Sequence, residues 1–506
     1  MLGPSGTSEQ NQLSIEIRAQ TRLGLADLRP LALTRVAIAL KTQSGAVLKD
    51  IPIHRVWHGN PDSFSGSGKT LLTVRTWWEH CSRGHPSCKL PDEASIFVPK
   101  RLIYVRGNAQ SHNVRLVETS EALRVQQQNG HGGRLLYTAL SHCWGGDVKK
   151  DNYEDLKRGL RGSLLPANFR DAVAITQGIG VSYIWIDSLC IIQDSPRDWE
   201  EESPRMGQIY SAAELVIAAT ASASSKGGCF RQRRNVWEPA LMRDPTMPAS
   251  YYTLGDVAWQ LPDLFSEQVE SAPLAKRAWA FQERLLSRRM VHFCSNIVLF
   301  ECGTARASEH DPADMRPYPE DDHSRFRDTI FGWLHAPRPP LSDSEGDRAA
   351  RGIRGALKFL VSMEGIDAAS PDSTPQVFSF SKRWYEIVSA YSGGELTRPT
   401  DKLVALSGVA DLVQRQHKMP YLAGCWDHGA MAGIHLLWVA RSSPLRPRRI
   451  QYCAPSWSWA SVDGRVELLP RVDVPDYPSI RVVAQGPHGG CVFSGPASKS
   501  GREPGG

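Results

Sequence analysis

The segment LPANFRDAVAITQGIGVSYIWI, residues 165–186, changes its hydrophobic period halfway along. In its first part, apolar residues from Phe169 to Ile179 recur near helical spacing, and Gly180 supplies a stop. Its second part, residues 181–186, is rich in β-branched and aromatic residues and has the length of a buried strand. The sequence therefore predicts a helix that leads directly into a strand.

The same alternation continues on both sides of this segment. Before it, GRLLYTAL at 133–140 suits a strand. After it, DWEEESPRMGQIYSAA at 198–213 suits a helix that Pro204 bends or shortens, and ELVIAAT at 214–220 suits another buried strand. Strands that alternate with helices at these spacings predict parallel βαβ units and an α/β fold.

Polar residues follow each of the three predicted strands. Open parallel sheets bind ligands beyond the carboxyl ends of their strands, so these residues are candidates for one shared site. We expect the following side chains to approach one rim of the sheet: Ser141, His142, Cys143, Asp187, Ser188, Cys190, Thr220 and Ser222.

Cys143 is a candidate nucleophile, with His142 as its base and Asp187 to orient the imidazole. Such an arrangement suits acyl transfer or hydrolysis. Adjacent residues of a strand point to opposite faces, so only a turn at the following glycines could bring His142 and Cys143 together. The alternative for Cys143 is a small buried thiol. Asp187 is the stronger candidate, since a carboxylate after a buried strand is costly unless it is hydrogen-bonded or functional, although it could only cap the following turn.

The rest of the chain has a less regular pattern. LAKRAWAFQERLLSRRMVHFC at 274–294 predicts a helix entering a strand, and the following segment is crowded with Pro, Asp, Glu and Ser. We divide the chain into an N-terminal region at 1–130, a core at 131–303, a Pro- and acid-rich linker at 304–350, a C-terminal region at 351–485 that packs on the core, and a disordered tail at 486–506.

The composition excludes some classes of partner. The net charge of +6 comes from 59 basic and 53 acidic residues mixed along the chain, which predicts no nucleic-acid partner. No signal peptide is visible, and no apolar run reaches the roughly 18 residues of a membrane helix, so we expect a soluble cytoplasmic protein without a membrane partner. The ten cysteines are scattered along the chain and do not form the dense framework of a disulfide-rich secreted domain, so we expect most of them to be reduced thiols.

Two N-terminal motifs resemble known sites only in part. SFSGSGKT at 63–70 ends like a phosphate-binding loop, but Ser63 stands where the first glycine belongs and the preceding residues are a poor strand. CSRGHPSC at 81–88 brings Cys81, His85 and Cys88 within reach of one another. Zinc requires four ligands, and no second pair at zinc-ribbon spacing is visible. The sequence therefore favours a flexible connection and a helix end packed by thiols, and we predict no metal site.

Three blocks carry a family resemblance. YTALSHCWGG at 137–146, the stretch at 165–222 and RAWAFQERLLSRRMVHF at 277–293 resemble the successive blocks of the fungal heterokaryon-incompatibility (HET) domain, over residues 135–302. The flanks WWEHCSRGHPSC, VPKRLIYV, DKLVALSGVA, YLAGCW and APSWSWASVDG also resemble full-length family members. Family members often carry Tyr where His142 stands and Asp where Ile192 stands, so this chain departs from the family at both positions.

The resemblance implies a cytoplasmic effector of non-self recognition, whose activation in fused fungal cells leads to growth arrest and regulated cell death through an incompatibility partner or self-assembly. It also implies a central parallel sheet flanked by helices, similar to Toll/interleukin-receptor (TIR) domains and flavodoxin-like, with further α+β regions at both ends of the chain. Some TIR-like proteins cleave NAD with a glutamate in a helix near the carboxyl edge of the sheet. This analogy makes Glu201 and Glu202 candidates, and NAD a candidate substrate rather than a cofactor.

The alternative is a metabolic enzyme on the same fold, which would use a Cys/His/Asp or carboxylate site for acyl transfer, cyclisation or hydrolysis of a small molecule. The catalytic candidates for the two functions are Asp187, Cys143, His142, Glu202 and Glu201. The predicted ligand contacts are Ser141, Trp144, Gly145, Ser188, Cys190, Gln193, Thr220, Gln282, Glu283 and Arg284.

Overall fold

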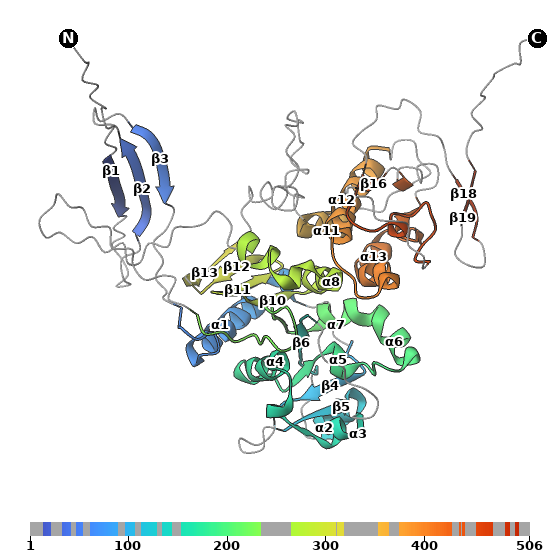
Figure 1. Cartoon of the computed structure of the whole chain (residues 1–506), viewed down its shortest axis with the longest axis horizontal. Coiled ribbons are helices and arrows are strands. Elements are labelled where there is room, and N and C mark those ends of the chain that lie inside the picture. The colour runs from blue at the N-terminus through green and yellow to red at the C-terminus, as the bar shows by residue number, and fades with distance from the viewer. Residues whose placement is uncertain are drawn as a thin grey trace, which may run out of the picture.

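A ten-stranded sheet is the main feature of the described part of the chain (Figure 1). From one edge to the other its strands are β13 (Asp311–Pro317), β12 (Ala305–Ser308), β11 (Val298–Cys302), β10 (Arg289–Phe293), β9 (Leu215–Ala218), β6 (Thr138–Ser141), β8 (Tyr183–Trp185), β4 (Arg101–Tyr104), β5 (Asn113–Glu118) and β7 (Leu160–Arg161). This computed structural model describes residues 14–21, 33–41, 47–53, 61–89, 97–106, 113–128, 134–143, 153–233, 265–309, 311–317, 353–363, 374–427, 435–436, 438–440, 452–468, 481–485 and 491–494.

The middle of the sheet is parallel. β8 pairs with β6, β6 with β9, and β9 with β10, all in parallel register, as when Ala139 lies opposite both Trp185 and Val216. Numbered along the chain, these four strands stand in the order second, first, third, fourth. The predicted parallel βαβ units are confirmed. The whole sheet is mixed, because the outer strands on both sides pair antiparallel.

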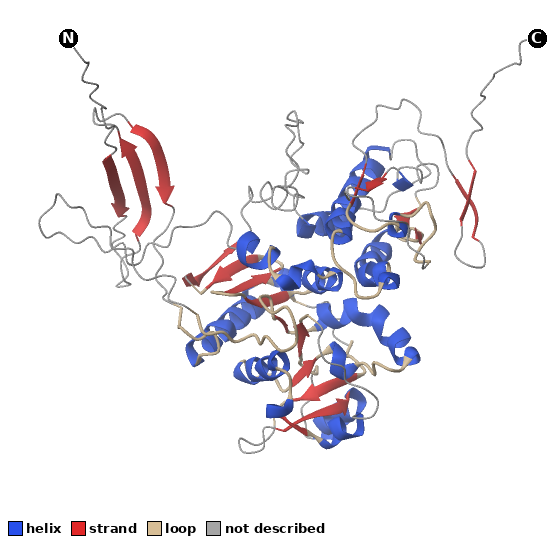
Figure 2. Ribbon diagram, in the orientation of Figure 1, coloured by secondary structure: helices blue, strands red, loops and turns tan. Residues whose placement is uncertain are grey.

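Helices lie on both sides of the sheet (Figure 2). α4 (Ala167–Gly178) connects β6 to β8, whereas α6 (Pro196–Glu202) and α7 (Met206–Ala212) connect β8 to β9 in the opposite direction across the sheet. Right-handed crossovers in opposite directions place their helices on opposite faces. Accordingly α1 (Gly68–Gly84) packs on α4, and α8 (Ala278–Leu286) packs on α7.

Short helices complete this part of the chain. They are α2 (Thr119–Gln128), α3 (Tyr153–Arg158) and α5 (Asp187–Cys190). The predicted effect of Pro204 is confirmed, since a 3₁₀ turn at Ser203–Arg205 separates α6 from α7. No helix among the described residues combines the length and the apolar character that a membrane crossing needs.

A second hydrophobic core lies in the C-terminal region, which is formed by α11 (Ile353–Ser362), α12 (Thr374–Ser392), α13 (Val404–His417), β14 (Tyr421–Leu422), β15 (Cys425–Trp426), β16 (Trp438–Ala440) and β17 (Val466–Leu468). The indole rings of Trp384 and Trp426 meet edge to face at 5.2 Å in its centre. The region contacts the sheet domain through α13, which packs on α7 and α8. At the crossing, a Cβ atom on Gly408 would lie 2.8 Å from the Cα of Gly207, so both helices need glycine there.

Two expectations about the ends of these regions were wrong in part. The segment expected to be a linker from residue 304 begins with β12 and β13, which extend the sheet as a hairpin. Pro312 is tolerated because β13 is an edge strand, and its carbonyl accepts a hydrogen bond from Trp77 Nε1. The tail expected to be disordered contains β19 (Cys491–Ser494), where a short apolar run pairs with β18 (Arg481–Gln485). Residues 318–350 lie outside the described part.

The first part of the chain also contributes strands. β4 and β5 belong to the large sheet, although they fall within the N-terminal region of the sequence-based division. β1 (Ser14–Thr21), β2 (Leu33–Lys41) and β3 (Val47–Ile53) form a separate antiparallel sheet.

Candidate active site

The carboxyl ends of β6, β8 and β9 lie at one edge of the sheet. From β6 the chain moves to β8 on one side, and it then returns past β6 to β9 on the other side. Ligands of open α/β sheets bind outside such a point of reversal. Ser141 ends β6, Asp187 follows β8 and Thr220 follows β9, so the predicted convergence of these junctions on one edge is confirmed.

His142 and Asp187 meet across this edge. Nδ1 of His142 lies 3.7 Å from Oδ1 of Asp187, and both residues are buried. The imidazole packs edge to face against Phe169, with ring centroids 5.1 Å apart. Burial lowers the pKa of His142, and the Asp187 carboxylate opposes this shift. The imidazole is therefore neutral at pH 7.

Asp187 is held by the turn that it begins. Its Oδ1 accepts a hydrogen bond from the backbone N–H of Ser188 at 2.7 Å, which is the capping role that the sequence left open. The side chain of Gln193 donates to the carbonyls of Asp187 and Ile191, at 3.1 and 2.9 Å. These bonds fix the loop after β8 and direct the carboxylate toward His142.

Glu283 supplies a second carboxyl group from α8. It is buried, and this burial raises its pKa to about 7. The Arg277 guanidinium and the hydroxyls of Ser141 and Tyr210 oppose the rise, while the charge of Asp187 adds to it. A carboxyl group with this pKa gains and loses a proton near neutral pH, as a general acid or base must.

Several buried polar atoms at this edge have no hydrogen-bond partner among the described residues. They are His142 Nδ1, Ser188 Oγ and Glu283 Oε2. Most buried polar atoms in proteins are paired, and a cluster of unpaired ones from three different elements is typical of a site that binds a polar group.

Cys143 has a weaker case as a nucleophile. Burial raises the pKa of its thiol, and Arg277 only partly opposes this effect. The protonated thiol is a poor nucleophile, which agrees with the alternative of a small buried side chain. Arg277 also donates a hydrogen bond to the backbone carbonyl of His142. The predicted contacts Trp144 and Gly145 lie outside the described residues.

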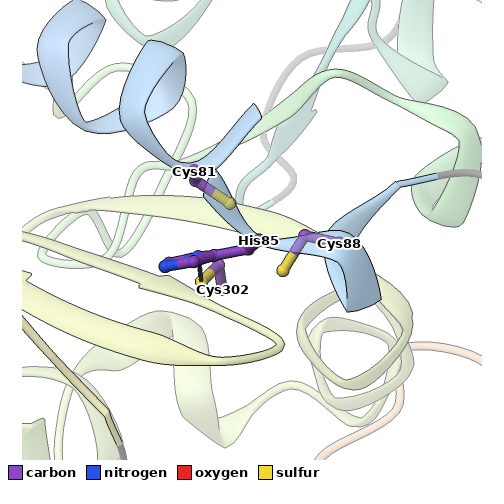
Figure 3. A group of neighbouring side chains, drawn as sticks. All are labelled: Cys81, His85, Cys88 and Cys302. Atoms are coloured by element: carbon purple, nitrogen blue, oxygen red, sulfur yellow. Dashed lines mark hydrogen bonds between the residues drawn. The ribbon is translucent and has the colours of Figure 1, made fainter. Parts of the chain in front are cut away.

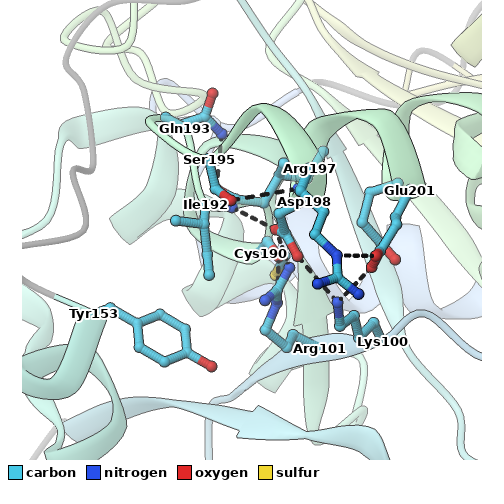
Figure 4. A network of polar contacts seen from close by, with 12 residues as sticks. Lys100, Arg101, Tyr153, Cys190, Ile192, Gln193, Ser195, Arg197, Asp198 and Glu201 are labelled. Carbon is cyan, nitrogen blue, oxygen red and sulfur yellow. Dashed lines mark hydrogen bonds and ion pairs between the residues drawn. The ribbon is translucent and has the colours of Figure 1, made fainter.

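Glu201 and Glu202 belong to a different environment, on α6. Figure 4 shows the network around Asp198. Its carboxylate accepts hydrogen bonds from the side chains of Lys100 and Arg101 and from the backbone N–H of Ile192. Glu201 is half-exposed and forms ion pairs with Lys100 and Arg197.

Glu202 is buried and pairs with Arg205 at 2.9 Å. Burial raises its pKa, and the charged groups that act on it are Arg205, Arg101 and Asp198 rather than Asp187. The catalytic roles of Glu201 and Glu202 stay predictions of the family analogy.

Other predicted contacts make structural bonds. Gln282 Oε1 accepts the backbone N–H of Gly408 at 2.8 Å, which attaches α8 to α13. The carbonyl of Cys190 accepts from Arg101, and burial raises the pKa of its thiol to about 12. Ser222 donates to Asn168 at 3.1 Å.

Thr220 and Arg284 lie at the two ends of a chain of polar contacts that runs through the buried residues His292 and Glu301. The sequence did not indicate this chain. Thr220 Oγ1 lies 3.2 Å from His292 Nδ1, and His292 Nε2 lies 3.1 Å from Glu301 Oε1. Arg284 donates two hydrogen bonds to Glu301, at 2.6 and 3.1 Å. His292 and Glu301 lie within strands whose other residues are mostly apolar, so only a charged residue inside an apolar run could have signalled this network.

The phosphate-loop alternative has no support in the geometry. Lys69 lies in the first turn of α1, and the described residues directly before this helix, 61–67, form bends and turns rather than a strand. Its ammonium group lies 3.8 Å from the carboxylate of Asp62. The hydroxyl of Thr70 donates to Glu309 at 2.8 Å, so it serves as a buried link to the end of β12.

Comparison with known families agrees with the blocks recognised in the sequence. Residues 137–283 match the family described as Heterokaryon incompatibility protein (HET). Neither a curated protein nor a solved structure matches this chain. The matched segment begins one residue before β6 and ends at Glu283, so it includes both carboxyl groups of the candidate site.

Proposed function

We propose that the protein is a cytoplasmic effector of fungal non-self recognition whose activation leads to growth arrest and cell death, because its residues 137–283 match the heterokaryon incompatibility (HET) family. The family match supports the biological role. The buried cluster of Glu283, Asp187 and His142 supports an enzymatic step at the carboxyl edge of the sheet.

The order of the parallel strands supports a TIR-like arrangement. Second, first, third, fourth is the order in which flavodoxin-like sheets begin, and these sheets bind ligands between their first and third strands. In this chain those strands are β6 and β9. NAD is the substrate that this analogy suggests. The carboxyl groups of Asp187 and Glu283 and the hydroxyl of Ser188 could bind the hydroxyl groups of its ribose.

The proposed reaction is hydrolysis of the bond between nicotinamide and ribose. Nicotinamide leaves as a neutral ring with the electron pair of the broken bond, so it needs no proton. Water adds to the ribose carbon, and its proton passes to the Glu283 carboxylate. Asp187 stabilises the positive charge that develops on the ribose, while Ser141 and His142 orient its hydroxyls.

A second candidate, acyl transfer or hydrolysis in small-molecule metabolism, is favoured by the approach of His142 to Asp187. That chemistry would need a nucleophile such as Cys143 and an imidazole that accepts its proton. Because the pKa of the Cys143 thiol is raised, acyl transfer or hydrolysis is the weaker of the two candidate functions.

The test is expression of the full chain in fungal cells, with viability and cellular NAD scored together. We expect the wild type to stop growth and lower NAD, and Glu283→Gln to do neither. Glu200→Gln, on the exposed side of α6, is the matched control and should behave as the wild type.

Three outcomes separate the candidates. Growth arrest without loss of NAD would retain the effector and reject NAD cleavage. A harmless wild type with unchanged NAD would reject both the effector role and NAD cleavage, and would favour the metabolic enzyme. Loss of function in Cys143→Ala but not in Glu283→Gln would favour the metabolic enzyme.

A further inference from the structure

Four side chains with metal-binding atoms meet where α1 ends against the sheet (Figure 3). Cys81 lies in the last turn of α1, His85 follows this helix, and Cys88 ends the 3₁₀ turn Pro86–Cys88. Cys302 is the last residue of β11. One ligand atom from each residue lies within 4.8 Å of the other three, and Cys302 Sγ lies 3.4 Å from His85 Nδ1.

These separations suit a tetrahedral zinc ion. Zinc binds thiolate sulfur at about 2.3 Å and imidazole nitrogen at about 2.0 Å, which places neighbouring ligand atoms about 3.5–3.8 Å apart. The sequence displayed three of the four ligands, and the fourth comes from a strand far along the chain. No fourth ligand lies near these three in the sequence, and in the structure Cys302 supplies it.

The surroundings of the cluster favour thiolates over packed thiols. Arg289 Nε lies 3.2 Å from Cys81 Sγ, and the backbone N–H groups of Thr304 and Ala305 donate to Cys302 Sγ at 3.4 and 3.2 Å. The Thr304 hydroxyl lies 3.6 Å from Cys88 Sγ. Neutral buried thiols have no need of a cation, whereas donors of this kind support metal-bound sulfur.

The charges beside the cluster are complementary to a metal-thiolate site. Three thiolates, a neutral imidazole and Zn²⁺ carry a net charge of −1, and the buried guanidinium of Arg289, which also lies 3.6 Å from the Glu214 carboxylate, places a positive charge beside them. The remaining nitrogens of Arg289 donate to the backbone carbonyls of Glu214 and Cys88, so the cation is held in place beside the cluster.

We propose that Cys81, His85, Cys88 and Cys302 bind one Zn²⁺ ion in a structural site that fastens α1 to the end of β11. Four protein ligands leave no open position for a substrate, so the site is closed and its role is to stabilise the fold. The metal site is separate from the proposed active site and does not depend on the proposed reaction.

The first test is the metal content of the purified full chain, prepared under reducing conditions from zinc-supplemented cells. We expect about one zinc per chain in the wild type, since a closed four-ligand site holds one ion. We expect Cys302→Ser to lower this content several-fold. Cys294→Ser, which changes a buried cysteine outside the cluster, should keep it. A wild type without zinc, or with iron in its place, would overturn the proposal.

The second test does not depend on a variant that folds. Removal of zinc from the wild type by a chelator should lower its Tm, and restored zinc should return it. Addition of Co²⁺ to the metal-free chain should produce the visible and near-ultraviolet bands of a thiolate-bound tetrahedral ion. An unchanged Tm after zinc removal, or no such bands with Co²⁺, would count against the site.

Arg289 offers a test of the surroundings. Arg289→Gln keeps all four ligands and removes the neighbouring charge, so we expect zinc affinity to fall by about 10–100-fold. Competition with a chromophoric chelator measures this change. An affinity equal to that of the wild type would contradict the role assigned to this charge.

Discussion

Nδ1 of His142 lies 3.7 Å from Oδ1 of Asp187, although the two residues follow different strands of the sheet. The distance is too long for a hydrogen bond and short enough for the carboxylate to act on the ionisation of the imidazole. Together with Glu283 from α8, this pair forms the candidate active site. We expect single substitutions there to remove activity while the protein still folds.

Asp187→Asn should remove function while the fold survives. The amide oxygen of asparagine can still accept the hydrogen bond from Ser188 N–H, so the turn stays closed. The charge that acts on His142 and on the substrate disappears, and we expect at least a roughly hundredfold loss in the rate of NAD consumption. Asp155→Asn, an exposed residue of α3, is the control. Activity of Asp187→Asn close to that of the wild type would contradict the assignment.

Glu283 should make stability depend on pH in a defined direction. Its pKa is about 7 in the folded chain, against an ordinary value of 4.5. Between these two values the folded state keeps a proton that the unfolded state has lost. Stability due to this group is therefore full below pH 4.5 and falls as pH rises toward 7, by about 1.4 kcal/mol for each pH unit.

Glu283→Gln removes this titration, and the measurement is Tm at pH 5.5 and pH 8. We expect the decrease in Tm between these two values to be smaller in Glu283→Gln than in the wild type. The comparison cancels the contributions of His142 and other groups, which are present in both proteins. Equal decreases would show that Glu283 is already ionised at the lower pH.

Glu309 should be a stability residue outside the candidate active site. Its carboxylate pairs with Arg233 at 2.7 and 3.2 Å and also accepts the backbone N–H of Val298. Glu309→Ala leaves a buried guanidinium without its counter-charge, so we expect a loss of about 3–5 kcal/mol in the free energy of unfolding. Chemical denaturation measures this loss. Glu79→Ala, at a half-buried residue of α1 whose partners Arg75 and Arg83 are exposed, should destabilise the protein much less, because ion pairs at the surface contribute little, and an equal effect of the two substitutions would refute the prediction.

Gly408→Ala should weaken the attachment of the C-terminal region. The added Cβ would lie 2.8 Å from the Cα of Gly207 and 2.9 Å from Gln282 Oε1. Overpacking of this kind costs about 1–3 kcal/mol. We expect faster hydrogen exchange in α8 and α13, with Gly393→Ala as the control because its nearest atom would be 3.9 Å away. Unchanged exchange in both helices would contradict the close packing.

The sequence predicted the elements whose signals are local. The helical spacing before Gly180 and the β-branched run after it correspond to α4 and β8, and the topology rule for parallel strands brought Asp187 toward the end of β6. The antiparallel pairing of the outer strands was missed because each strand pairs with a partner that the local sequence does not identify. β12 and β13 were hidden by a composition typical of linkers.

The candidate site was predictable only in part. Their position after a strand indicated His142 and Asp187. The same rule could not single out Glu283, which belongs to α8 and whose raised pKa results from its burial in the folded chain. Gln282 and Glu283 are neighbours on α8. Only the tertiary packing determines that Gln282 contacts α13 while Glu283 faces the edge of the sheet. Cys302 was missed for the same reason, since nothing local relates β11 to the end of α1.

The α8 helix connects the two hydrophobic cores through consecutive residues. Gln282 is bonded to the backbone of α13, and Glu283 carries the carboxyl group beside Ser141. The same short helical segment therefore contacts α13 and carries this acid. A fragment cut at residue 283 would divide α8 and omit β10, so the segment that matches the family is smaller than the sheet and helices to which it belongs.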